Sequence, residues 1–488
     1  MRKFFRRIFR FLFLAILVIL AIVIFKTYTY HSMQVAIDPI PKSEVNEKAP
    51  ERLAGAVRFE TVSFEDHMDT LPFLNLDTFL QTAFPKMFER MERIDVASPS
   101  ILLKWAGAKP MLPPVLLMGH LDVVPAEKET IDDWAEGPFS GKLGDGFVWG
   151  RGTLDDKLNV MGLLESANTL LEQDYQPERT LYFSFGHDEE LGGRNGAAKI
   201  ADYFKDQGIR FEYVLDEGLL ILDGALPGLS RPLAMIGTSE KGEATLKLEV
   251  KLDEGGHSSM PPAETAIGVL SEALNRLHEN PCPARLDGPT LELLQHAGPE
   301  TSPFFRALFA NTWLTKGMLI RQFSQSASSN AVVRTTTAPT IVHAGVKSNV
   351  LPSTGYAMVN FRIIPGETPE SVADYVEKTI REPRIAVSIM PGAVPPSPVS
   401  PTNTFGFQAI EKTIRQIFPE AVVSPALVIA QTDSRHFTGL SDAVYRFTPV
   451  RLTKADLSRI HGINERISVD GYKDLLRFYG QLIVNSTQ

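Results

Sequence analysis

The sequence predicts an α/β protein: a mostly parallel sheet covered by helices on both faces, interrupted by a smaller α+β unit and preceded by a transmembrane helix. Three observations carry this prediction. Short buried-strand patterns alternate with helical patterns from residue 51 onward, as in open parallel sheets. Residues 244–252 instead alternate strictly between apolar and polar side chains, which is typical of a half-exposed strand. Residues 11–25 form a continuous apolar run.

Residues 1–30 are predicted to form a signal anchor. The first ten residues hold five basic side chains and no acid, and the apolar run ends at Lys26. A span of about 20 residues crosses the hydrocarbon core, and the basic cluster places the N-terminus in the cytoplasm and the rest of the chain outside. The alternative is a cleaved signal peptide and a secreted protein, but residues 26–30 supply no small-x-small cleavage site. Residues 31–50 are polar, contain three prolines and are interpreted as a tether.

Composition narrows the class of protein. The chain has 488 residues and a net charge of −9; without the five N-terminal basic residues, 44 basic residues face 58 acidic ones, a net −14. This acidic balance argues against nucleic acid as a partner. The single cysteine, Cys282, excludes an internal disulfide and a thiolate metal cluster.

The first part of the predicted catalytic domain, residues 51–237, alternates between helices and strands. Buried strand patterns occupy residues 114–118, 180–185 and 213–215, and helical patterns occupy residues 76–92, 158–173 and 193–204. Because parallel strands need crossover helices, this order favours a mostly parallel sheet.

Residues 238–393 are predicted to form an inserted domain. Strand patterns at 244–252, 335–343, 356–363 and 385–389 are interleaved with helical patterns at 263–278 and 369–380. The resulting order, strand–helix–strand–strand–helix–strand, is that of a ferredoxin-like unit. The proline-rich residues 391–401 connect it to the second catalytic part, residues 394–488.

Five short segments place carboxylate or imidazole side chains at strand ends or just beyond them, where open α/β sheets build sites. The residues that stand out are His120, Asp122, Asp155, Glu189, Glu190, Asp216 and His461. Taken singly, each of these residues could have a purely structural role, such as a hydrogen-bonded histidine at a strand end or an acid that caps a helix N-terminus. Together, oxygen and imidazole donors without thiolate indicate a hydrolytic metal site for Zn²⁺, Co²⁺ or Mn²⁺.

The sequence resembles the dinuclear zinc amidohydrolases that include aminoacylase, carnosinase and carboxypeptidase S, and within them the N-fatty-acyl-amino acid synthase/hydrolase branch. The resemblance covers residues 51–486. The motifs that carry it are GHLDVVP (119–125), GRGTLDDK (150–157), FGHDEELGG (185–193), LDEG (215–218), GGHSSMPP (255–262), AGVKSNVLP (344–352), VNFRIIPGET (359–368), TDSRHF (432–437) and RIHGINERIS (459–468).

The resemblance implies two zinc ions per subunit, with Co²⁺ or Mn²⁺ as substitutes, bridged by Asp155, whose peptide bond to Asp156 is expected to be cis. One metal is completed by His120 and Asp216, and the other by Glu190 and His461. Two further residues are given roles: Asp122 orients His120, and Glu189 is the general base.

The inserted domain is expected to act as a lid that contacts the substrate. The resemblance implies that His257 stabilises the oxyanion, often across a homodimer formed through the lid. Arg362, a guanidinium on a strand, suits a substrate carboxylate, and Asn330 is a second candidate for that group. Part of residues 283–329 is hypothesised to line an acyl-chain pocket, although aromatic side chains at helical spacing more often pack internally.

Three functions are weighed for the chain. The first is a membrane-anchored zinc hydrolase that cleaves the amide bond of N-acyl amino acids, including fatty-acyl ones. The second is a carboxypeptidase or dipeptidase that acts on short peptides and uses the same ligand residues. The third, a non-catalytic binding module on a hydrolase scaffold, is disfavoured because all five ligands and the base are present.

Overall fold

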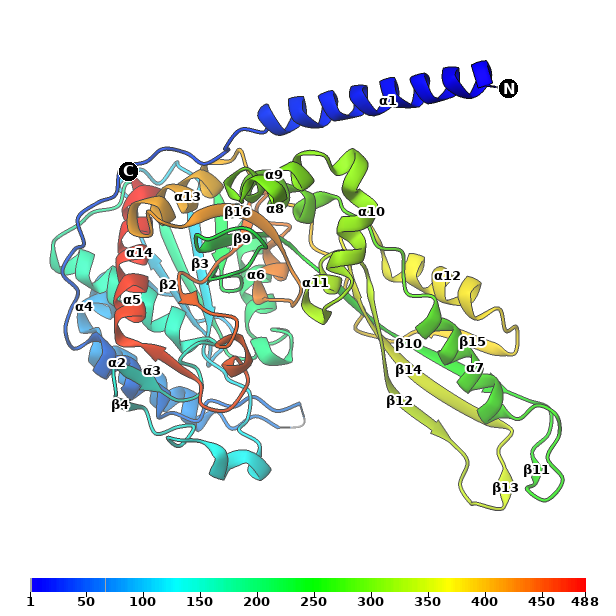
Figure 1. The fold of residues 1–488 in the computed structure, drawn as a ribbon. Coiled ribbons are helices and arrows are strands. Elements are labelled where there is room, and N and C mark those ends of the chain that lie inside the picture. Colours follow the sequence, from blue (N-terminus) through cyan, green and yellow to red (C-terminus); the bar gives the residue numbers. More distant parts are fainter. Residues whose placement is uncertain (1, 66) are drawn as a thin grey trace.

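The computed structural model describes residues 2–65 and 67–488. A larger unit holds most of the chain, a smaller unit projects from it, and helix α1 (Arg2–Tyr28) lies along the outside (Figure 1). Helix α1 is long and apolar enough to cross a membrane, and none of its described side chains is buried.

The larger unit is built on a ten-stranded mixed sheet. Its four central strands are β6 (Leu181–Gly186), β3 (Val115–His120), β7 (Tyr213–Asp216) and β17 (Val444–Arg446), all mutually parallel. Outside them lie β1 (Glu92–Arg93), β2 (Ile101–Trp105), β8 (Ile221–Leu222), β9 (Leu233–Glu240), β16 (Val422–Val428) and β18 (Arg451–Leu452).

The prediction of a mostly parallel sheet describes only part of this sheet. The pairs β1–β2, β2–β6, β17–β9 and β8–β9 are antiparallel. The links 94–100 and 223–232 contain no helix. Neighbouring strands joined by a short link without a crossover helix can pair only in antiparallel fashion. The outer strands of the sheet therefore depart from the alternation of strands and helices that is expected of a parallel sheet.

Side chains alternate between the two faces of the central strands. Val115 and Leu117 enter one hydrophobic cluster, whereas Leu116 and Met118 enter another. The first face is covered by α2 (Ala49–Val57), α3 (Leu71–Ala83), α4 (Pro85–Arg90), α5 (Lys157–Glu172), α13 (Phe405–Ile417) and α14 (Val469–Thr487). The second is covered by α6 (Ala197–Asp206) and the 3-10 helix η4 (Asp433–Phe437). Helices on both faces bury the sheet and leave its strand ends as the accessible edge.

The smaller unit is a four-stranded antiparallel sheet in the order β12–β14–β10–β15. Its elements are β10 (Gly242–Lys251), α7 (Ala266–Glu279), β12 (Thr336–Ala344), β14 (Thr354–Ile363), α12 (Pro369–Ile380) and β15 (Ile385–Ile389). Both helices pack into the same core as the strands. The short pair β11 (Gly256–His257) and β13 (Val350–Leu351) lies at the end farthest from the larger unit (Figure 1).

A helical insertion between α7 and β12 packs on the larger unit. Its helices are α8 (Gly288–Ala297), α9 (Pro303–Ala310), α10 (Thr312–Phe323) and α11 (Ala327–Ala331). Leu294, Phe309 and Leu319 form a core with Leu233 of β9 and Val422 of β16. The insertion therefore covers one margin of the large sheet.

The segment after α1 is also bonded to the larger unit. The side chain of Gln34 exchanges hydrogen bonds of 2.7 and 2.9 Å with the backbone of Val423 in β16. The Tyr30 hydroxyl donates to the carbonyl of Leu294 in α8. These contacts connect the end of α1 to the insertion and to the sheet.

Candidate active site

The predicted metal-ligand residues converge at the carboxyl ends of the central strands. His120 ends β3 and Asp216 ends β7, while Glu189 and Glu190 follow β6 in the 3-10 helix η2 (Glu189–Leu191). Asp155 lies in the loop between β5 (Phe147–Trp149) and α5, and its peptide bond to Asp156 is cis, as expected. This edge is where parallel sheets place functional side chains.

Asp155 lies between two imidazoles. Its Oδ1 is 3.0 Å from Nε2 of His120, and its Oδ2 is 2.9 Å from Nε2 of His461. The same nitrogen of His461 lies 3.3 Å from Oε1 of Glu190. Donor atoms of His120, Asp155 and Glu190 all lie within 4.8 Å of one another. One carboxylate thus joins two neighbouring clusters of donors, each containing a histidine.

Asp122 contacts His120 and the backbone of Glu189 and Glu190, and so connects β3 to η2. It is fully buried, and its carbonyl and Oδ1 lie 3.0 and 3.3 Å from Nδ1 of His120. Its carboxylate also accepts hydrogen bonds of 3.1 Å from the backbone N–H groups of Glu189 and Glu190, and one of 2.6 Å from the Ser63 hydroxyl. A carboxylate that fixes the far nitrogen of a ligand histidine is a common feature of metal sites.

The charges of the site are strongly coupled. Burial by itself would raise the pKa of Asp155 and lower that of His120, but their contact with one another, together with Asp122 and His461, reverses both shifts. Hydrogen bonds to Asp155 and Glu190 raise the pKa of His461 to about 10. Positive charge is therefore stabilised at both imidazoles, on either side of Asp155.

The donor set fits divalent metal ions. Oε1 of Glu190 is buried, and among the described residues it contacts Nε2 of His461 at 3.3 Å. Carboxylates at this density repel one another in a low dielectric unless cations lie among them. Imidazole and carboxylate donors without a thiolate suit a hydrolytic zinc site.

Glu189, the general base expected from the resemblance, lies in the cleft close to His120. It lines a cleft of about 950 Å³, and its Oε2 lies 4.0 Å from Nε2 of His120. Burial, reinforced by nearby carboxylates including Asp433 and Glu190, raises its pKa well above the usual value. A carboxyl group whose pKa is raised by its environment can both accept and return a proton.

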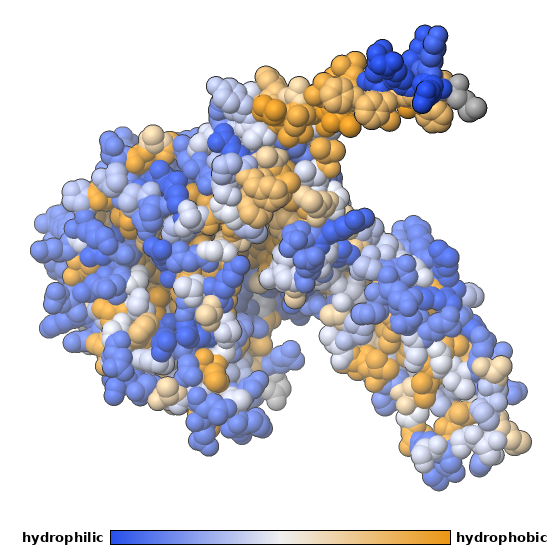
Figure 2. Space-filling model, viewed as in Figure 1, coloured by the Kyte–Doolittle hydropathy of each residue, from blue (hydrophilic) through white to orange (hydrophobic). Residues whose placement is uncertain are grey.

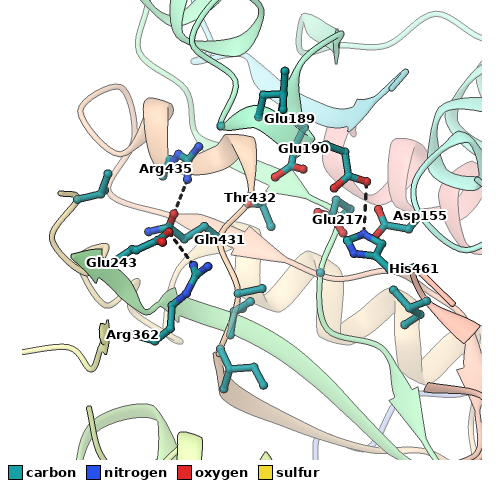
Figure 3. A pocket seen from close by; sticks show the side chains of 18 of the residues that line it. Asp155, Glu189, Glu190, Glu217, Glu243, Arg362, Gln431, Thr432, Arg435 and His461 are labelled. Atoms are coloured by element: carbon teal, nitrogen blue, oxygen red, sulfur yellow. Dashed lines mark hydrogen bonds and ion pairs between the residues drawn. The ribbon is translucent and has the colours of Figure 1, made fainter. Parts of the chain in front are cut away.

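The cleft extends from the acidic cluster to a second, cationic end (Figure 3). Arg362 of β14 lies there with Nη1 3.0 Å from Oε2 of Glu243 in β10. Arg435 of η4 lies beside it and donates a 2.6 Å hydrogen bond to Gln431. Arg362 was predicted from the sequence, whereas Arg435, which lies within the TDSRHF segment, was not. The cleft thus lies between the two units and presents two guanidinium groups opposite the carboxylates.

Glu217 was not among the site residues predicted from the sequence, but the structure places it in the cleft. Glu217 lines the cleft beside Asp155 and His461 (Figure 3), and burial together with Asp155, Asp156 and Glu189 raises its pKa. Asp216 instead accepts hydrogen bonds from the backbone N–H groups of Ser434, at 2.7 Å, and Glu217, at 3.0 Å. Neighbouring residues of an extended strand point in opposite directions, so only a three-dimensional structure distinguishes the two acids.

Three other predicted contributors lie away from this cleft. His257 is exposed on β11, where its Nδ1 lies 2.8 Å from the Ser259 hydroxyl. Asn330 lies in α11 and does not line the cleft. No described residue from 283–329 lines it either. The acyl-pocket hypothesis for that segment is therefore unsupported. Its buried apolar side chains, which include Leu294, Phe309 and Leu319, pack against β9 and β16.

A mixed α/β sheet with imidazoles and carboxylates gathered at its strand ends defines a hydrolase of the metallopeptidase class. The chain belongs to peptidase family M20/M25/M40, whose model matches residues 116–485. The Xenopus tropicalis protein named N-fatty-acyl-amino acid synthase/hydrolase PM20D1 is 41% identical, over 96% of this chain and 93% of its own. A Dictyostelium discoideum protein named probable carboxypeptidase S-like 2 is 43% identical, over 89% of this chain and 84% of its own.

The fold is shared with solved members of the family. The M20 family metallo-carboxypeptidase Sso-CP2 from Sulfolobus solfataricus superimposes with a TM-score of 0.64 at 16% identity, over 90% of this chain and 99% of its own. The family resemblance inferred from the motifs is confirmed, and the chain is an enzyme of this hydrolase family.

Proposed function

We propose that this chain hydrolyses the amide bond of N-acyl amino acids at a dinuclear zinc centre. The observation that carries the proposal is the position of Asp155 between the imidazoles of His120 and His461, with Glu189 beside them in the cleft. Relatives named as N-fatty-acyl-amino acid synthase/hydrolases support the substrate class.

Asp155 would bridge the two metal ions. His120 would complete one metal and Glu190 with His461 the other. The remaining ligand position, given to Asp216 in the sequence analysis, is proposed here for Glu217, because its carboxylate faces the cleft while both oxygens of Asp216 accept backbone hydrogen bonds. Asp216 would then position the loop that ends β7.

Zinc ions bound there would lower the pKa of a water molecule and polarise the amide carbonyl. Glu189 would take the proton from the attacking water and return it to the leaving nitrogen, a role that suits its raised pKa. Arg362 and Arg435 would bind the carboxylate of the amino-acid part, since guanidinium groups match carboxylates in charge and geometry.

The smaller unit is proposed to act as a lid, because β10 and β14 supply Glu243 and Arg362 to the cleft. A homodimer through this unit remains the expectation. Its edge strand β12 exposes Ile341 and Val342, which supports pairing with a second copy. His257 would then reach the partner's site from the far end of the unit, and Asn330 remains a candidate for substrate contact.

Membrane anchoring by α1, with the catalytic part outside the cytoplasm, is also proposed. Its support is the length and apolarity of the helix and the five basic residues at its start.

A substrate panel distinguishes the two enzymatic alternatives. With zinc present, the proposal expects faster turnover of an oleoyl-amino acid than of short peptides; the reverse order would favour a carboxypeptidase or dipeptidase. The Glu189→Gln variant should bind the wild-type amount of zinc and lose turnover by about 10²- to 10⁴-fold. Normal turnover in that variant would contradict the mechanism.

A further inference from the structure

The outer surface of α9 and α10 combines exposed apolar side chains with basic ones. Phe304, Trp313, Leu314 and Met318 are between 48% and 68% exposed. Lys316 and Arg321 are exposed on the same helix as the last three. We call these six residues the docking face. Trp313, Leu314, Met318 and Arg321 recur at the spacing of one helical face, while Leu319 on the opposite side of α10 is buried in the core.

This surface lies within a long stretch of sequence that contains basic residues and no acidic ones. Residues 301–366 contain six Lys or Arg and no Asp or Glu, in a chain whose net charge is −9. Neither Lys316 nor Arg321 forms an ion pair with a carboxylate among the residues that the structure describes. A mixed apolar and basic surface is the composition expected of helices that lie in an anionic lipid interface.

The docking face is held beside the last turns of α1. The amide of Asn311, between α9 and α10, donates to the Val23 carbonyl at 3.3 Å and to the Thr27 hydroxyl at 3.1 Å. The ammonium group of Lys26 lies 5.9 Å from the centre of the Trp313 ring. Apolar surface continues from α1 onto the helices beneath it (Figure 2).

The connection that follows α1 limits how far the two can separate. Arg306 donates a 2.6 Å hydrogen bond to the Tyr30 carbonyl, and the Tyr30 hydroxyl donates to Leu294. If α1 crosses a bilayer, Val23 and Thr27 lie near the end of the membrane-spanning part of the helix. Because Asn311 is bonded to both residues, α9 and α10 then lie at the lipid surface.

We propose that the docking face binds the surface of the bilayer in which α1 is anchored, with its apolar side chains among the acyl chains and Lys316 and Arg321 at anionic headgroups. This inference rests on anchoring by α1, which belongs to the proposed function. It gives the membrane a second contact with the enzyme and fixes the orientation of the larger unit on the lipid surface.

Trp313 supplies a direct probe. The chain has four tryptophans, and the other three are at most 8% exposed. The full-length chain would be placed in nanodiscs of phosphatidylcholine, with or without phosphatidylglycerol, in which the acyl chains carry bromine. The proposal expects bromolipid quenching that Trp313→Phe abolishes, together with protection of Trp313 from aqueous iodide.

The charge contribution is tested by Lys316→Glu with Arg321→Glu. In nanodiscs that contain phosphatidylglycerol, each reversal should lower the ratio of docked to undocked chains by at least about fivefold, because one basic residue near an anionic surface contributes about 1 kcal/mol. The matched control is Lys251→Glu with Lys347→Glu, two exposed residues on the smaller unit, which should leave the quenching unchanged.

Carbonate extraction tests whether α1 anchors the chain in the membrane. If the chain stays in the membrane, either of two quenching results would overturn the inference. In one, Trp313 is quenched by iodide and not by bromolipid, so the face points to water. In the other, Trp313 is shielded from both quenchers, so the face binds protein. Release of the chain by carbonate would instead refute membrane anchoring by α1, and with it the inference. Extraction and quenching are separate measurements, so the two kinds of failure can be distinguished.

Discussion

Substitution of Arg446 alone is expected to destabilise the fold around the site. Arg446 is one of the largest fully buried side chains among the residues that the structure describes. Its guanidinium donates hydrogen bonds to the Ser434 hydroxyl at 2.8 Å, to the Val444 carbonyl at 2.9 Å and to Oε2 of Glu240 at 3.0 Å. Ser434 in turn donates its backbone N–H to Asp216. The guanidinium therefore connects β9, η4 and the end of β7.

The Arg446→Met variant should lose about 3–5 kcal/mol of unfolding free energy, because it leaves the carboxylate of Glu240 buried without its cation. The size follows from the burial of both side chains, which are 0% and 2% exposed. Glu240 keeps two 2.7 Å hydrogen bonds from Thr432 through Oε1. A neutral glutamine at 240 can keep those two bonds, so Arg446→Met with Glu240→Gln should recover most of the loss.

Guanidinium chloride unfolding of the full chain in detergent measures this difference through the intrinsic fluorescence. The single variant should shift the midpoint clearly and the double variant much less. A loss below about 1 kcal/mol in the single variant, or an equal loss in both variants, would refute the reasoning that an uncompensated buried charge dominates.

Three further predictions concern the site and the pH dependence of stability. Glu217→Gln should bind about half of the wild-type zinc, whereas Asp216→Asn should keep the stoichiometry and weaken the affinity by about 10- to 100-fold; elemental analysis decides, and the opposite pattern would return the ligand role to Asp216. Arg362→Ala should raise KM for an N-acyl amino acid by at least about tenfold and leave KM for its methyl ester unchanged; equal effects on both would remove the carboxylate contact. Burial raises the pKa of Glu411 to about 7 despite the opposing charge of Arg415. The folded state therefore holds a proton that the unfolded state releases above its own lower pKa, and stability falls as pH rises to about 7. Glu411→Gln should then add up to about 3 kcal/mol at pH 8 and nothing near pH 4, and a pH-independent change in unfolding free energy would contradict this.

Much of the organisation could be predicted from the sequence because it is encoded in local patterns. The apolar run of α1, the buried strands β3 and β6 and the positions of their following acids depend on side-chain periodicity over a few residues. Since parallel strands share one carboxyl edge, placing His120 and Glu190 after two such strands was enough to predict that they meet. The cis peptide after Asp155 and the family itself followed from the motifs.

Other features depended on contacts between distant parts of the chain. Local periodicity does not encode which strands pair, so the antiparallel margins of the sheet and the packing of α8, α9 and α10 on β16 could not be read from it. A motif such as Asp-Glu-Gly likewise contains two carboxylates. Asp216 accepts backbone hydrogen bonds from Ser434 and Glu217, whereas the carboxylate of Glu217 faces the cleft, and the sequence does not show this difference. The sequence by itself determined the donor groups and their order, and tertiary structure decided which of them face one another, because side-chain direction is fixed by packing and hydrogen bonds between segments far apart in the chain.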